Sequence, residues 1–126
     1  MQVNAREAHM IVIESEMLIL RAMCTGAPDG RVWQDALDIL GNYPFQDHLH
    51  QIIFDTLREL NTDDPRIIQG LLAARLTRKG FPDVELSGFF APHNLRSAIL
   101  LAMMQSVSGL ARRRARREGV AATATR

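Results

Sequence analysis

The sequence predicts an all-α protein, a compact bundle of about five to six helices. Apolar residues recur every three to four positions along most of the 126 residues. Short turns rich in Gly, Pro, Asn and Asp separate these stretches, and no stretch alternates polar and apolar residues over the length of a strand. A chain of this length is most simply one domain, which can bury a core without a disulfide or a metal.

The first two helices are expected on either side of a turn at residues 25–30. Apolar side chains at helical spacing from Met10 to Met23 predict the first helix. The second is shorter, from Arg31 to Leu40, and is followed by a Gly-Asn pair that is typical of a helix stop. The inward face of the first helix is expected to carry Met10, Ile11, Ile13, Met17, Leu18, Leu20 and Cys24.

Asp47 and Asp64 are the expected N-caps of the third and fourth helices. A carboxylate at this position accepts bonds from unpaired backbone N–H groups and favours the positive end of the helix. Pro65 supports the second assignment, because proline at the first helical position loses no hydrogen bond. The third helix is expected to end at Leu60 and the fourth near Lys79. The inward face expected for the fourth helix consists of Ile67, Ile68, Leu71, Leu72 and Leu76.

The last third of the chain combines a loop, a helix and a basic tail. Residues 81–92 lack a helical period and are expected to form a structured loop. The last helix is expected to begin near Pro92–Asn94 and to run through Gly109 into a block of arginines. The final residues 120–126 are small and polar, and we expect them to be disordered. The chain thus divides into a helical domain, 1–111, and a basic, partly disordered tail, 112–126.

Positive charge is concentrated in that tail. The whole chain has a net charge of +1, but residues 1–111 hold nine Lys and Arg against thirteen Asp and Glu, a net charge of −4. Phosphate contacts by basic residues make nucleic-acid binding strongly dependent on salt. The alternative is a solvated helix end that complements the helix dipole. The candidate nucleic-acid contacts are Arg112, Arg113, Arg114, Arg116 and Arg117.

The stretch PFQDHLHQIIF places two histidines beside an aspartate and raises the question of a metal or acid–base site. On a helix, His48 and His50 diverge, so they do not form a metal-binding pair. Glu14 and Glu16 are expected on different helix faces, and the sequence contains no nucleophile motif and no phosphate loop. We therefore expect no enzymatic activity, no catalytic residue, no metal and no cofactor.

The chain shows no signal peptide and no uninterrupted apolar run of about 18 residues. Its single cysteine, Cys24, cannot form an internal disulfide, which suits a reducing compartment. A cytoplasmic protein without a membrane contact is the expectation.

Candidate partner-binding residues lie in the loop and on the last helix. Burying one phenylalanine contributes about 1.5–3 kcal/mol, so three in one loop must cover either the bundle or a partner. Methionine repacks easily at adaptable interfaces, although ordinary core filling is the alternative. The predicted partner-binding residues are Phe81, Phe89, Phe90, Met103 and Met104.

A helix-turn-helix is a further alternative, with a turn at residues 41–44 and the helix from Asp47 to Leu60 reading DNA. That helix begins with acidic residues and histidines. Arg, Lys, Asn and Gln are the residues that usually read bases, so the pattern does not favour this alternative.

The segment Phe45 to Phe54, FQDHLHQIIF, resembles the F-x-D-x-x-H-x-x-I-F segment of the N-terminal helical domain of DnaB-type replicative helicases. The helix around Glu16 and the one after Asp64 are similar to helices of that domain, and the resemblance covers roughly residues 10–107. The C-terminal helicase-binding domain of bacterial primases has the same small fold. The resemblance implies a non-catalytic protein–protein interaction module of DNA replication, and it implies that His50 packs structurally.

The chain also departs from these families. These 126 residues contain neither an ATPase core nor a zinc-binding or nucleotidyl-transfer domain. We therefore expect a replication-linked adaptor or regulator with a helicase- or primase-like partner, and a homodimer is a further expectation. The alternative is a small DNA-binding regulator that uses the basic tail and contacts nucleic acid non-specifically.

Overall fold

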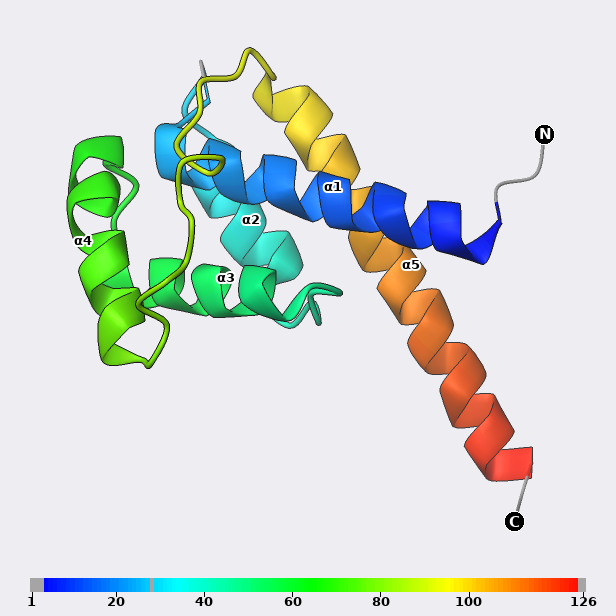
Figure 1. The fold of residues 1–126 in the computed structure, drawn as a ribbon. Helices are drawn as coiled ribbons and strands as arrows, with labels where there is room; N and C mark the ends of the chain where they lie inside the picture. Colours follow the sequence, from blue (N-terminus) through cyan, green and yellow to red (C-terminus); the bar gives the residue numbers. More distant parts are fainter. Residues whose placement is uncertain (1–3, 28, 125–126) are drawn as a thin grey trace.

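The computed structural model describes residues 4–27 and 29–124, with side chains described as far as Arg116. Within these residues the chain forms helices and no strand, which confirms the all-α class. None of these helices has a stretch both long and apolar enough for a membrane span. The five helices are α1 (Ala5–Thr25), α2 (Val32–Leu40), α3 (His48–Leu60), α4 (Pro65–Arg78) and α5 (Ser97–Ala124) (Figure 1).

The helix α1 is the centre of the arrangement, since it packs against each of the other four helices. α2 and α5 also pack against each other, and so do α3 and α4. The connection between α4 and α5 passes along α1, where Arg21 Nε donates to the carbonyl of Gly88 at 2.7 Å. In Figure 1 the start of α1 and the end of α5 project beyond the other helices and diverge from each other.

The core lies where the five helices meet. Every helix contributes at least one large side chain with less than 2% of its surface exposed, so the helices hold each other in place through apolar burial. These side chains are Phe54, Ile19, Leu20, Met23, Leu40, Ile53, Leu57, Ile68, Leu72, Leu76, Leu100 and Met104.

Both predicted N-caps are confirmed. Asp47 Oδ1 accepts from the backbone N–H groups of Leu49 and His50 at 2.8 and 3.2 Å. Asp64 Oδ1 accepts from Arg66 N–H at 2.9 Å, with proline at the first helical position. The turn after α3 is closed by Asn61, which adopts a left-handed conformation with φ of 51°.

The ends of α1 and α5 differ from the sequence-based bounds. α1 begins at Ala5, five residues before the predicted start, because Asn4 caps it by accepting from Glu7 N–H at 2.8 Å. α5 begins at Ser97, whose hydroxyl donates to the carboxylate of Asp29. This hydrogen bond lowers the pKa of Asp29 below its usual value and ties the start of α5 to the loop before α2.

At its other end α5 runs through the arginine block, as predicted, and its backbone stays helical to Ala124. Disorder was expected from residue 120 onward. Alanine-rich sequence has high helix propensity and can continue an existing helix without burying anything. Residues 125–126 lie outside the described residues.

The predicted inward faces of two helices were partly wrong. Met10 and Ile11 are 57% and 54% exposed, because the first turns of α1 project beyond the other helices. α4 makes its main contacts with α1 and α3, and the single stripe of Ile68, Leu72 and Leu76 is buried there. The predicted inward residues that are instead exposed on α4 are Ile67 and Leu71, at 45% and 44%.

Candidate functional site

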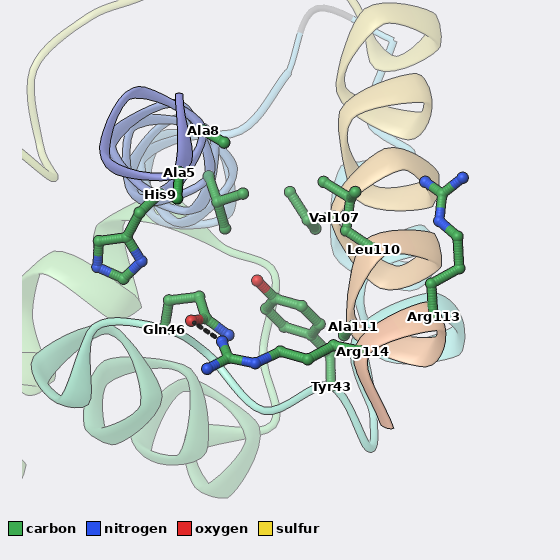
Figure 2. A pocket seen from close by; sticks show the side chains of 11 residues that line it. Ala5, Ala8, His9, Tyr43, Gln46, Val107, Leu110, Ala111, Arg113 and Arg114 are labelled. Carbon is green, nitrogen blue, oxygen red and sulfur yellow. Dashed lines mark hydrogen bonds between the residues drawn. The ribbon is translucent and has the colours of Figure 1, made fainter. Parts of the chain in front are cut away.

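A groove lies between the diverging ends of α1 and α5 (Figure 2). Its volume is about 490 Å³. Both walls are built from small or aliphatic side chains, since the inner face of each helix continues past the point where the core ends. The apolar residues that line the walls are Ala5, Ala8 and Val12 on α1, and Val107, Leu110 and Ala111 on α5.

Polar side chains lie at the base and edges of the α1–α5 groove. Tyr43 and Gln46, from the connection between α2 and α3, line its base. His9 lines it from α1, and Arg113 and Arg114 line it from α5. Arg114 Nη1 donates to Gln46 Oε1 at 3.0 Å, so the guanidinium lies over the groove base (Figure 2). The groove is therefore apolar along its walls and positively charged on the α5 side.

The predicted nucleic-acid contacts lie on different sides of α5. Arg112, Arg113, Arg114 and Arg116 are all exposed, and Arg117 belongs to the helix although its side chain lies outside the described residues. Arg112 Nη2 donates to Ser108 Oγ at 3.4 Å, and Arg112 lines a second depression together with residues of α2. Arg116 follows Arg112 by one helical turn. The arginines thus form two sets, one beside the groove and one facing away from it.

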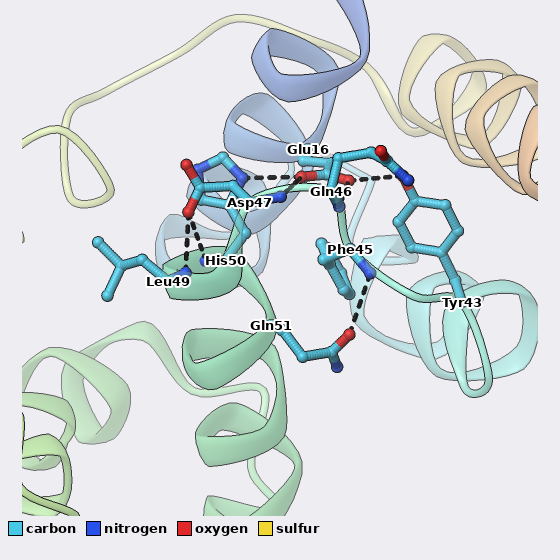
Figure 3. A network of polar contacts seen from close by, with 8 residues as sticks. All are labelled: Glu16, Tyr43, Phe45, Gln46, Asp47, Leu49, His50 and Gln51. Carbon is cyan, nitrogen blue, oxygen red and sulfur yellow. Dashed lines mark hydrogen bonds and ion pairs between the residues drawn. The ribbon is translucent and has the colours of Figure 1, made fainter. Parts of the chain in front are cut away.

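Below the groove base lies a buried polar network around Glu16, which is fully buried (Figure 3). Its Oε2 accepts from the hydroxyl of Tyr43 at 2.5 Å and from Gln46 N–H at 2.6 Å. Its Oε1 accepts from Asp47 N–H at 3.3 Å and contacts Nδ1 of His50 at 3.0 Å. Because an ionised carboxylate only accepts hydrogen bonds, His50 donates from Nδ1.

This network joins α1 to the start of α3. Burial raises the pKa of Tyr43, and its hydrogen bond to Glu16 and the charge of that carboxylate raise it further. The His50 ring packs edge-on against Phe89 with 5.8 Å between ring centroids. His50 is thus buried and bound within the fold, as the resemblance implied.

The burial of Glu16 was not predicted from the sequence, although a signal was present. Val12, Ile19, Leu20 and Met23 lie three, four or seven positions from Glu16, so they share one helix face with it. A carboxylate within an apolar stripe indicates a buried partner. The partner itself could not be read from this helix, because it lies some 30 residues further along the chain.

The predicted partner-binding residues do not form one surface. Phe89 is 5% exposed and Met104 is fully buried, so both fill the core and present no surface to a partner. Phe81, Phe90 and Met103 are half-buried against the core. The loop phenylalanines cover the bundle, and the partner-binding role of the three half-buried residues stays a prediction.

The structure also shows where the candidate metal ligands, the single cysteine and the alternative recognition helix lie. In the described part of the chain, no three His, Cys, Asp or Glu side chains gather closely enough to hold a metal ion. Cys24 is fully buried, and burial raises its pKa to about 12, so its thiol is neutral at physiological pH. The first turn of α3, which a recognition helix would present to DNA, is bound to Glu16 through Asp47 and His50.

Fold and site together define an all-helical bundle whose central helix carries a buried carboxylate and whose two longest helices enclose an apolar groove with a basic edge. No family model, curated protein or solved structure matches the chain.

Proposed function

We propose that the chain is a non-enzymatic protein-interaction module that binds a protein partner in the α1–α5 groove. The observation that carries this proposal is the apolar lining of a groove that opens to solvent, with Leu110 45% exposed at its wall. Apolar surface that is left exposed in a hollow, next to polar groups, is typical of binding sites. The resemblance to the helical domains of DnaB-type helicases and primases supports a role as a replication-linked adaptor or regulator.

Burial of groove surface would supply the affinity. Each Å² of apolar surface removed from water contributes about 25 cal/mol, so covering Leu110 and its neighbours favours association. The positive edge would add orientation and faster association with an acidic surface. The groove borders the core, since Tyr43 and Val107 belong to both.

The test is a binding assay with replicative helicase and primase from the native cell, using the full chain and two matched variants. Leu110→Asp places a charge in the groove wall. Ile67→Asp places the same charge at an equally exposed apolar position on α4, with 45% exposure at both sites. We expect the first variant to lose the partner and the second to keep it, also at high salt. Retention of the partner by Leu110→Asp would contradict a role for the groove.

A second candidate function is non-specific binding of nucleic acid. The observation that favours it is the cluster of exposed arginines on α5, within about one and a half turns of helix. Each phosphate neutralised changes the slope of log affinity against log salt by about −0.9 on duplex DNA. If α5 binds DNA, replacing all five arginines with Gln abolishes the salt-dependent affinity, whereas Leu110→Asp, which keeps all five, weakens it much less.

A further inference from the structure

We propose that the segment bound in the α1–α5 groove is an amphipathic helix that carries acidic residues beside its apolar face. This inference rests on the proposed interaction function and names the chemistry of the partner. Three features of the groove support it: its walls, its size and the position of its charge.

The walls are the exposed continuations of two helices that diverge. A third helix can lie along such a hollow and extend the bundle, which is how amphipathic helices bind apolar grooves. Ala5 and Ala8 lie one helical turn apart on the α1 wall and have small side chains, so the backbone of a bound helix can approach closely. On the α5 wall, Leu110 is 45% exposed and offers a matching aliphatic surface, whereas Val107 is 3% exposed and belongs to the core.

The size of the groove limits what enters it. A helix with its side chains is about 10–12 Å wide, so its backbone would lie over the opening. A volume of about 490 Å³ has room for a few apolar side chains from one face of that helix. Side chains three and four positions apart share such a face, so leucine-like residues at this spacing are the expected anchors.

The charge of the groove determines what flanks those anchors. Arg113 and Arg114 both line it from α5, and Gln46 holds the Arg114 guanidinium in place. Guanidinium groups bind carboxylates through paired hydrogen bonds, so acidic residues are favoured on the side of the bound helix that faces α5. The remainder of the domain, residues 1–111, has a net charge of −4. Since both arginines that line the groove belong to α5, an acidic helix is attracted to that side of it, which determines how the helix lies in the groove.

The two sets of arginines distinguish this occupant from nucleic acid. An acidic helix in the groove would use Arg113 and Arg114 and leave Arg112 and Arg116 on the opposite side. A nucleic-acid backbone, attracted by the total positive charge, would depend on both pairs to a similar degree. The pairs are matched in size and charge, so exchanging either one changes the net charge equally.

The experiment is a selection from a displayed library of helical peptides against the full chain. Every peptide has leucine at positions i, i+3, i+4 and i+7, and each flanking position is drawn from Glu, Lys and Gln. The variants are Ala8→Trp, which fills the groove from an exposed position, the pair Arg113→Glu with Arg114→Glu, and the control pair Arg112→Glu with Arg116→Glu. Circular dichroism on each variant verifies that it is folded.

We expect the unaltered chain to enrich peptides with Glu on one flank. Ala8→Trp should weaken the binding of an enriched peptide by about tenfold or more, which corresponds to about 1.4 kcal/mol. The groove-side pair should reverse the preference from Glu to Lys, and the control pair should change affinity by less than about threefold. A reversal produced only by the groove-side pair is a readout that a general loss of stability cannot give.

Three results would overturn the inference. The first is that the unaltered chain retains no peptide better than the Ala8→Trp variant does. The second is enrichment of peptides without a charge preference, and the third is equal weakening of peptide binding by both arginine pairs. The last result would instead indicate attraction by total charge, as for nucleic acid. If Leu110→Asp loses the helicase or primase partner but the unaltered chain enriches no peptide with acidic flanks, binding in the groove stands while the acidic helix as its occupant fails. The two proposals can therefore fail separately.

Discussion

Glu16 shows how a single side chain joins distant parts of this chain. Its carboxylate has four hydrogen-bonding partners from the segment 43–50, and none of the described buried side-chain nitrogen or oxygen atoms lacks a partner. Buried charges of this kind require paired donors, because they have lost their contact with water. The same contacts place Tyr43 and Gln46 at the base of the groove, so Glu16 supports the site without touching a ligand.

Replacing Glu16 with Gln should therefore destabilise the fold strongly. The amide cannot accept from all four donors and leaves His50 without its charged partner. We expect the free energy of unfolding to fall by about 3 kcal/mol or more, measured by urea denaturation. Glu14→Gln is the control: Glu14 is exposed two positions away, so its change should stay within about 0.5 kcal/mol. Equal effects of the two changes would contradict the role of the network.

Cys24 should react with thiol reagents only when the chain unfolds. Its side chain is fully buried and its pKa is raised to about 12, whereas the thiolate is the reactive form. At pH 8 we expect alkylation within minutes in denaturant and at least a hundredfold more slowly in the native protein, followed by mass spectrometry. Native-state labelling at the denatured rate would show that the end of α1 opens readily.

The same pKa predicts how stability depends on pH. A neutral thiol is favoured in the native state, so this contribution is fully present below the pKa of the unfolded chain, about 8.5. It is lost as the pH rises from there towards about 12. Cys24→Ala should lose less stability over that interval than the unaltered chain, which thermal unfolding at pH 8 and pH 10 would measure.

At the scale of the element, α5 changes its role along its length. Its first part packs against α1 and α2 through Leu100, Met104 and Val107, and Leu110 then faces the groove. Beyond these residues the helix carries arginines on several sides. One continuous helix thus contributes to the core, the groove wall and the charged surface, so movement of α5 would affect all three.

Two neighbouring methionines test which face of α5 is buried. Met104 is fully buried and Met103 is half-buried, so they differ in contact but not in chemistry. Met104→Ala should lower the free energy of unfolding by about 2–5 kcal/mol through the cavity it leaves. Met103→Ala should cost clearly less. The reverse order in chemical denaturation would show that α5 is rotated from the position described here.

At the scale of the whole molecule, the residues that build the core and the residues that carry the C-terminal positive charge lie in separate parts of the chain. Among the residues with described side chains, Val107 and Ser108 are the last buried ones, whereas the positive charge begins at Arg112. The bundle thus folds through residues 5–108, and the surface chemistry of its C-terminal end is set by residues that do not support the core.

Truncation should reveal this division. Deleting residues 117–126 should change the free energy of unfolding by less than about 0.5 kcal/mol, because it removes no described core contact. Deleting residues 105–126 removes Val107 from the core and should cost several times more. Thermal unfolding followed by circular dichroism compares the two, and a large loss from the shorter deletion would place the end of the stable domain beyond Arg116.

Local chemistry explains what could be predicted from the sequence. The helical class, the approximate positions of all five helices and the caps at Asp47 and Asp64 depend on residues close together in the chain, and the structure confirms them. Capping and helical periodicity act within a few residues, so they can be read without knowledge of the fold. The arginine block was equally visible, because it depends on composition alone.

Only the tertiary structure decided which apolar residues are buried and where the site lies. Ile67 and Ile68 are equally apolar neighbours, yet only Ile68 faces another helix. Glu16 and His50 are 34 positions apart, so their contact depends on how α1 meets α3. The groove likewise results from the angle between α1 and α5. Long-range packing determines these features, because the angle at which two helices meet cannot be predicted from the sequence pattern of either one.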